Sequence, residues 1–298
     1  PFAAPPIGAL RWRAPAAVER WEGVLDATQF KPACKQLGEP CGWASIQGQA
    51  ASSEDCLYLN VYAPPSSTFA RYAAAAEGNF SGFPVMVFGP AGQFLWGSAN
   101  DLENREAPQF QSASDVIYVT MNYRLGALGF LALPELRQRE SSMEGVDAGT
   151  GNYGTQDQRA ALRWVQQNIR AFGGDSNKVT LMGESSGATI ASVHTVLPKS
   201  FGLFRSAIAS SGAFNTWSAK NLSHAYANGR AFAHNLGCAQ FGSDVDIECL
   251  VKIDAETLAS FGDDCGGNAT AQVNNLPYAD QVDASTWGPT LDGVEMDT

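Results

Sequence analysis

A serine between two glycines carries the chemistry that this sequence suggests most directly. Ser185 is the central residue of Gly183-Glu184-Ser185-Ser186-Gly187, a G-x-S-x-G pattern. A short apolar run ending at Met182 precedes it, and residues compatible with a helix continue to Pro198. This order of strand, turn and helix is typical of a nucleophile elbow, which needs glycines where a side chain would collide with neighbouring backbone. We predict that Ser185 is a nucleophile and that the amide N–H of Ser186 donates to an oxyanion.

A nucleophilic serine needs a base, and the three histidines of the sequence are poor candidates. His194 lies nine residues after Ser185 in the same expected helix, which places it about 13.5 Å along the axis and half a turn out of phase. We predict that it is a packed helix residue. His224 and His234 follow so soon that no room remains for the acid that comes between serine and histidine in proteins with this elbow. The sequence therefore predicts a base outside these three residues.

Strands and helices alternate along the chain in the order that would place Ser185 at the end of a parallel strand. Apolar runs predict strands at 57–62, 84–88, 115–120, 178–182 and 205–209. A capping-box pattern at 155–158 predicts the start of a helix with an apolar face. The alanine-rich stretch between the first two strands is predicted to be a polar loop, and the chain beyond Trp217 to be mostly helical. Because the sequence contains no internal repeat and no linker, we predict one α/β domain over residues 1–298.

Composition and charge exclude several classes of partner. Of the 298 residues 45% are hydrophobic and 16% are charged, as in an ordinary globule, and no apolar run is long enough to span a bilayer. The net charge of −11 argues against nucleic acid or an anionic membrane as a partner. None of the cysteine spacings resembles a zinc site, so we expect no metal. We also expect no cofactor.

Cysteines and glycosylation sequons indicate the compartment. Six cysteines accompany N-x-S/T sequons at Asn79, Asn221 and Asn268, a combination typical of an oxidising, secretory setting. We expect a secreted or extracytoplasmic protein. The chain opens with Pro1 and no targeting segment, so we expect a mature or truncated product.

One further motif has two interpretations. Gly149-Thr150-Gly151-Asn152-Tyr153-Gly154 matches the G-x-G-x-x-G of dinucleotide sites. Such a site needs a strand directly before it, whereas residues 141–148 are polar. We predict a loop that enters the following helix.

Several segments together resemble the type-B carboxylesterases, the family of cholinesterases and fungal lipases. The resemblance covers residues 1 to about 217 and becomes looser beyond. It implies an α/β-hydrolase fold and hydrolysis of small carboxylic esters through an acyl-enzyme. The matching segments are Ala4-Pro5-Pro6-Ile7-Gly8-Ala9-Leu10-Arg11-Trp12, Ser53-Glu54-Asp55-Cys56-Leu57-Tyr58-Leu59-Asn60-Val61, Asn122-Tyr123-Arg124-Leu125-Gly126, Gly151-Asn152-Tyr153-Gly154 and Phe172-Gly173-Gly174-Asp175.

The resemblance also implies roles for residues around the serine. Glu184 would organise the buried site or serve simply as a buried carboxylate, and Ser211 would hydrogen-bond in the same network. The oxyanion loop, usually H-G-G-G, is here Pro90-Ala91-Gly92-Gln93. Gly92 and Gln93 would donate backbone N–H groups together with Ser186. A side chain at Gln93 costs about 1–2 kcal/mol if that residue requires a positive φ.

The resemblance further implies disulfides Cys34–Cys56 and Cys238–Cys249, and leaves open whether Cys41 and Cys265 pair or stay free. The first loop is shorter than in cholinesterases, and their choline-binding tryptophan cannot be placed on Trp43, which argues against a choline ester as the substrate. Trp217 is either an acyl-pocket aromatic residue or a core tryptophan.

The C-terminal sequence resembles the segment that precedes the family's catalytic acid. Gly288-Pro289-Thr290-Leu291-Asp292-Gly293 corresponds to P-x-x-D-G. We therefore expect the acid and the histidine beyond Thr298, a chain truncated at both ends, and an inactive fragment. The alternative is a non-catalytic adhesion or scaffold protein on the same fold, as in neuroligin-like members.

Overall fold

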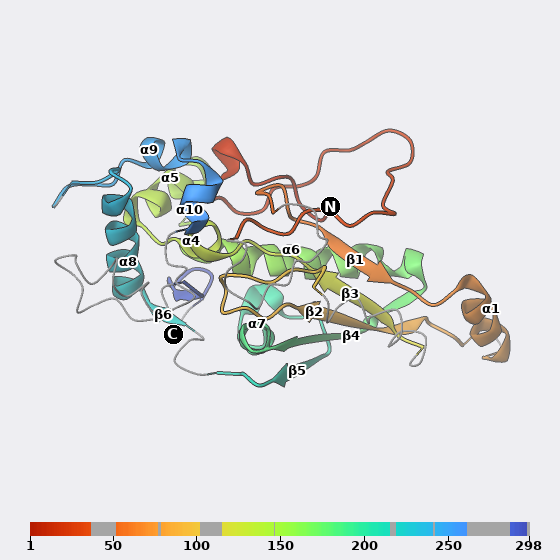
Figure 1. The fold of residues 1–298 in the computed structure, drawn as a ribbon. Coiled ribbons are helices and arrows are strands. Elements are labelled where there is room, and N and C mark those ends of the chain that lie inside the picture. The colour runs from red at the N-terminus through yellow and green to blue at the C-terminus, as the bar shows by residue number, and fades with distance from the viewer. Residues whose placement is uncertain are drawn as a thin grey trace.

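A mixed, mostly parallel sheet forms the centre of the molecule (Figure 1). The computed structural model describes residues 1–36, 52–76, 79–101, 115–145, 147–214, 219–240, 242–260 and 287–296. Within them the sheet has the strand order β1-β3-β2-β4-β5. In chain order its strands are β1 (Leu59–Tyr62), β2 (Phe83–Gly89), β3 (Ile117–Met121), β4 (Gly174–Glu184) and β5 (Ser206–Ser210).

The sheet has the character expected of an α/β protein. Only β1 and β3 pair antiparallel; β3 with β2, β2 with β4, and β4 with β5 are parallel. In the middle strands Val85, Val87 and Leu181 are fully buried, as in parallel strands covered on both faces. β5 is exposed along its whole length at the edge of this sheet. The predicted α/β class with a mostly parallel sheet flanked by helices is confirmed.

Helices pack around the sheet and complete the core (Figure 1). Helix α7 directly follows β4 and packs against β2, β4 and β5. The α-helices are α1 (Ser66–Ala75), α4 (Gly126–Phe130), α5 (Pro134–Glu144), α6 (Tyr153–Asn168), α7 (Ser186–His194), α8 (Leu222–Asn235), α9 (Ile247–Lys252) and α10 (Ala255–Ser260). Short 3-10 helices η1 (Gly8–Leu10), η2 (Ile169–Phe172) and η3 (Pro198–Ser200) and a small parallel pair, β6 (Lys220–Asn221) with β7 (Thr290–Leu291), complete the elements.

Two local predictions are wrong. The stretch expected to be a polar loop contains α1, because alanine has the highest helix propensity and three alanines end this helix. Helix α6 begins at Tyr153 instead of after a capping box at 155–158. Its N-cap, Asn152, makes no capping bond because its side chain pairs with Thr290: Nδ2 donates to the Thr290 carbonyl at 2.8 Å, and Oδ1 accepts from the Thr290 amide at 2.9 Å.

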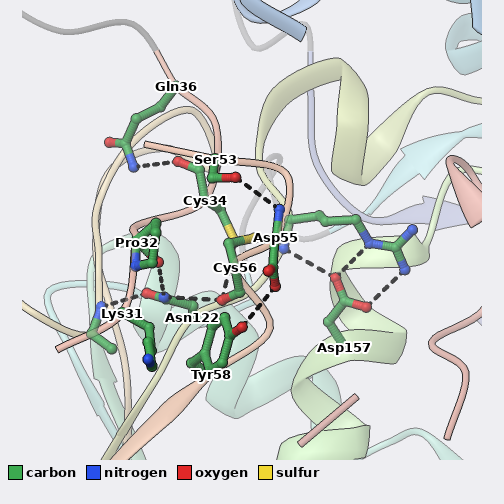
Figure 2. The surroundings of a disulfide bond; sticks show 12 residues. Lys31, Pro32, Cys34, Gln36, Ser53, Asp55, Cys56, Tyr58, Asn122 and Asp157 are labelled. Atoms are coloured by element: carbon green, nitrogen blue, oxygen red, sulfur yellow. Dashed lines mark hydrogen bonds and ion pairs between the residues drawn. A yellow bond between two sulfur atoms is a disulfide. The ribbon is translucent and has the colours of Figure 1, made fainter. Parts of the chain in front are cut away.

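The N-terminal segment is tied to the sheet beside a disulfide (Figure 2). The structure contains the bonds Cys34–Cys56 and Cys238–Cys249, the pairs that the resemblance implied. Asn122, one residue after β3, donates from Nδ2 to the carbonyls of Pro32 and Cys56 at 3.0 Å each. Its Oδ1 accepts from the Ala99 amide at 2.8 Å. This one side chain therefore fixes three chain segments to the end of β3.

The G-x-G-x-x-G motif forms a loop that enters α6 and is hydrogen-bonded to the segment containing β7. The Asp292 carboxylate accepts from the Thr150 amide at 3.0 Å, and also from the amides of Val294, Glu295 and Met296 at 2.9 to 3.1 Å. A Cβ on Gly149 would lie 2.2 Å from Asp292 Oδ2. The motif's first glycine is therefore needed for the approach of another part of the chain, and the predicted loop is confirmed.

We predict that Gly149→Ala destabilises the chain more than Gly145→Ala. Both glycines have left-handed backbone, with φ of +72° and +71°, so both substitutions cost about 1–2 kcal/mol in strain. A Cβ on Gly145 would have nothing within 4 Å, whereas a Cβ on Gly149 would meet Asp292 and Val294. Urea unfolding of the two variants measures the difference. Equal losses of unfolding free energy would show that the contact with Asp292 does not constrain Gly149.

Candidate functional site

Ser185 stands at a strained turn between a strand and a helix. Strand β4 ends at Glu184 and α7 begins at Ser186. Ser185 has φ +53° and ψ −119°, a conformation that L side chains rarely adopt. Its amide donates to the Ser210 carbonyl at 3.0 Å, and its carbonyl accepts from the Thr189 amide at 3.1 Å. The residue is half-buried. Backbone bonds on both sides thus hold the strained conformation in place.

Close backbone contacts explain the two glycines of the motif. A Cβ on Gly183 would lie 2.3 Å from the Gly187 carbonyl group, and a Cβ on Gly187 would lie 2.1 Å from the Gly89 carbonyl oxygen. Because neither atom is on a flexible side chain, larger residues at these positions would force the elbow open. Gly89 is the last residue of β2 and pairs in register with Gly183. The loop that follows β2 therefore leaves the sheet beside Ser185.

That loop contains the predicted oxyanion donors. Gly92 has φ +114°, and Gln93 has φ +56° with an exposed side chain. The condition stated for Gln93 is met, since its backbone lies in the left-handed region where a Cβ costs about 1–2 kcal/mol. Within the described residues, the backbone hydrogen bonds leave the amides of Gly92 and Gln93 without an acceptor. At the start of α7, the Ser186 amide lies among the first helical N–H groups, which have no partner within their own helix.

The predicted supporting residues, Glu184 and Ser211, lie where strands β4 and β5 end. Glu184 pairs in register with Ser210, so Ser211 follows directly beside the elbow. Ser211 also has a positive φ, +53°. A Cβ on Gly212 would lie 2.5 Å from the Ser185 carbonyl oxygen. The turn after β5 therefore packs against the backbone of Ser185.

All three histidines are described, and none is hydrogen-bonded to Ser185. His194 is fully buried at the end of α7; its ring nitrogens lie 2.8 Å from Ser200 Oγ and 3.1 Å from Gln158 Oε1. His224 and His234 are exposed on α8. The prediction that His194 is a packed helix residue is confirmed.

The structure draws attention to Tyr123, which the sequence placed in a family-like segment without giving it a role. It follows β3 by two residues and is 1% exposed, and its hydroxyl donates to the carbonyl of Pro90 at 3.3 Å. Its signal in the sequence is only its place in Asn122-Tyr123-Arg124, because a tyrosine after a strand is otherwise commonplace.

Other predictions concern the surface or fall outside the described residues. Asn79 and Asn221 are exposed, and Asn221 caps α8 by accepting from the Ser223 amide at 2.8 Å. In the described part of the chain, no helix is both long and apolar enough to cross a membrane, and no group of three or more His, Cys, Asp or Glu is arranged to hold a metal ion. Five residues singled out in the sequence lie outside the described ranges: Cys41, Trp43, Trp217, Cys265 and Asn268.

A mostly parallel sheet flanked by helices, with a strained serine turn between strand and helix, defines an α/β-hydrolase. Two solved structures share this fold over the whole of this chain. A thermophilic PNB esterase aligns with a TM-score of 0.78 at 32% identity, and the match covers 54% of that esterase. A carboxylesterase from Geobacillus stearothermophilus aligns with a TM-score of 0.75 at 31% identity, over 52% of its length.

The chain belongs to the carboxylesterase family, whose profile matches residues 1–295. It is 39% identical to juvenile hormone esterase of Tribolium castaneum over 88% of this chain and 40% of that protein. It is 36% identical to fumonisin B1 esterase of Sphingopyxis macrogoltabida over 100% of this chain and 47% of that protein. It is 34% identical to cholinesterase of Mus musculus over 98% of this chain and 44% of that protein. The chain thus spans about half the length of these curated relatives, and family and fold support ester hydrolysis in general.

We predict that Ser185→Gly unfolds at higher urea concentration than Ser185→Ala. Both variants lack the hydroxyl, but only alanine keeps a Cβ in the conformation with φ +53°. Relief of that strain should raise the free energy of unfolding by about 1–2 kcal/mol. If the alanine variant were equally or more stable, the backbone at residue 185 would not be strained.

We predict that His194 makes the chain lose stability in acid. Burial, with a smaller contribution from the charge of Arg159, lowers the pKa of His194 from 6.5 to about 3. Between these values the unfolded chain binds a proton that the folded chain does not. The contribution of neutral His194 to the free energy of unfolding is therefore fully present above pH 6.5. As the pH falls below that value, the contribution is lost by up to about 1.4 kcal/mol per pH unit.

The test compares urea unfolding from pH 7 to pH 4 in two variants. His194→Gln should show a shallower decline than the parent, and His234→Gln, altered at an exposed position, should decline as the parent does. Parallel curves for the parent and His194→Gln would contradict this assignment.

Proposed function

We propose that this protein is a carboxylic ester hydrolase with Ser185 as its nucleophile. The observation that carries the proposal is the strained turn at Ser185, which is held by backbone bonds on both sides and has no room for side chains at the flanking glycines. Such strain persists where the surrounding structure enforces it, and it concentrates at functional sites. In this proposal residues 1–298 form the N-terminal and middle portion of a single α/β-hydrolase domain.

The reaction is acyl transfer in two steps. The Ser185 oxygen attacks the ester carbonyl carbon and gives its proton to a base, forming a tetrahedral oxyanion. The carbon–oxygen bond to the alcohol then breaks, and the alcohol leaves with the proton. Water repeats the sequence on the acyl-enzyme and releases the carboxylic acid. The amides of Gly92, Gln93 and Ser186 stabilise the oxyanion, with Glu184 and Ser211 supporting the elbow.

The base and its acid partner come from outside residues 1–298. None of the three histidines is placed to act as the base for Ser185 in this proposal. His194 is hydrogen-bonded to Ser200 and Gln158, and His224 and His234 lie exposed on α8. We therefore propose that residues 1–298 alone do not turn over esters, and that the complete gene product does.

The strained backbone at Gln93 lowers the efficiency of the proposed site without removing it. Loss of one oxyanion donor costs about 2.7–4 kcal/mol in the transition state. A non-glycine residue such as Gln93 keeps a backbone φ of +56° only if the loop around it is firmly anchored. The substrate in this proposal is a small-molecule ester.

Two disulfides and exposed sequons at Asn79 and Asn221 support a secreted or extracytoplasmic location. We propose glycosylation at the two exposed sequons.

The test uses the complete gene product and its Ser185→Ala variant. The parent should hydrolyse a chromogenic short-chain ester and be labelled covalently by a fluorophosphonate, while Ser185→Ala should lose about 10⁴-fold or more in kcat and all labelling. Ser211→Ala serves as a control for loss of a nearby serine hydroxyl and should still be labelled.

Turnover that persists in Ser185→Ala would contradict the proposed nucleophile. A folded parent with neither turnover nor labelling would favour the non-catalytic adhesion or scaffold protein instead.

A further inference from the structure

The loop that carries Gly92 and Gln93 is anchored at both ends by the segment following β3. The hydroxyl of Tyr123 donates to the Pro90 carbonyl at 3.3 Å, and the amide of Gly126 donates to the Phe94 carbonyl at 2.7 Å. Both aromatic side chains are buried, Tyr123 at 1% exposed and Phe94 at 3%. The two donor residues thus lie between two fixed points.

The far end of the loop is rigid by its own packing. The Gly92 carbonyl accepts from the amides of Leu95 and Trp96 at 2.9 and 3.0 Å, which closes a tight turn. The Phe94 ring meets Phe130 edge to face at 5.3 Å. At the near end, the one side-chain hydrogen bond among the described residues to Pro90 comes from Tyr123.

The backbone of Tyr123 is held more firmly than that of an ordinary loop residue. The side chain before it, Asn122, binds three chain segments near the disulfide (Figure 2). The residue after it, Arg124, forms a buried bidentate ion pair with Asp157 of α6, with both N–O distances 2.7 Å, and its amide donates to the same carboxylate at 3.0 Å. The hydroxyl of Tyr123 is therefore presented from a fixed position.

Tyr123 also lies against the elbow. A Cβ on Gly187 would lie 3.2 Å from the Pro90 carbonyl oxygen, the same atom that Tyr123 binds. The buried Ser186 hydroxyl is a neighbour of the Tyr123 hydroxyl, although the two make no hydrogen bond of good geometry. Burial raises the pKa of Tyr123, so the hydroxyl remains a donor at every working pH.

We propose that Tyr123 is a positioning residue of the oxyanion hole: its hydroxyl holds Pro90, and through Pro90 the amides of Gly92 and Gln93, in register with the Ser186 amide. The inference rests on the proposed esterase function. The strained Gln93 makes this bond consequential, since a residue at φ +56° relaxes when its loop is released. Oxyanion donors act through preorganised geometry, so a small displacement weakens the transition state more than the bound ester.

The test is Tyr123→Phe in the complete gene product, which removes one oxygen and keeps the ring. We expect kcat for a short-chain ester to fall about tenfold with KM within about twofold, because the ester carbonyl gains charge only in the transition state. Affinity for a trifluoromethyl ketone, whose adduct with serine carries an oxyanion, should fall by the same factor as kcat.

The matched control is Tyr153→Phe. Tyr153 is also buried, and its hydroxyl lies 3.3 Å from Thr150 Oγ1; among the described residues it makes no hydrogen bond to the loop after β2. It should match the parent in kcat and in ketone affinity. Urea unfolding of both variants separates lost stability from lost geometry.

The outcomes are distinguishable. If Ser185→Ala is inactive while Tyr123→Phe keeps the parent's kcat and ketone affinity, the positioning role is overturned and the esterase function stands. If kcat and KM change together, or if Tyr153→Phe loses as much kcat, Tyr123 acts only through general stability and the proposal also fails. If Ser185→Ala retains full turnover, both proposals fall.

Discussion

The structure around the site depends on one close contact between backbones, where helix α7 begins against the end of strand β2. The Gly89 carbonyl and the first turn of α7 approach so closely that no Cβ fits on Gly187, and a Cβ on Gly183 would collide with the Gly187 backbone. This contact requires Ser185 to adopt a positive φ, since the chain must reverse within one residue to pass from β4 into α7. The parallel pairing of β2 with β4 then brings the loop after Gly89 beside the serine.

Polar side chains, rather than regular elements, fix the irregular segments around this contact. Asn122 secures the N-terminal region next to the Cys34–Cys56 disulfide (Figure 2), and Asp292 and Asn152 secure the segment at 287–296. Buried amides and carboxylates of this kind are stabilising only when their hydrogen bonds are complete, and each of these three makes several. The same arrangement explains why short motifs after strands, such as 122–124, hold distant parts of the chain.

The loop proposed to form the oxyanion hole is the most informative departure from the pattern that the family resemblance implies. Gln93, which stands where the resemblance implies a glycine, has a left-handed backbone at φ +56°, so the surrounding packing overrides the local preference of the residue. The fixed ends of the loop, at Pro90 and Phe94, account for this tolerance. Because Gln93 is strained, this loop depends more on these two fixed ends than a loop with three glycines would.

The sequence by itself determined the α/β class, the position of most strands and the turn at Ser185, because these follow from local periodicity and glycine spacing. The alanines of residues 66–75 are a local signal for a helix, which the loop prediction did not use. The start of α6 at Tyr153 could not be determined, since the side chain of Asn152 pairs with Thr290, 138 residues away. Only the tertiary structure decided what the glycines of 149–154 face and which hydroxyl holds Pro90. Such contacts join residues whose spacing in the sequence carries no information about their distance in space.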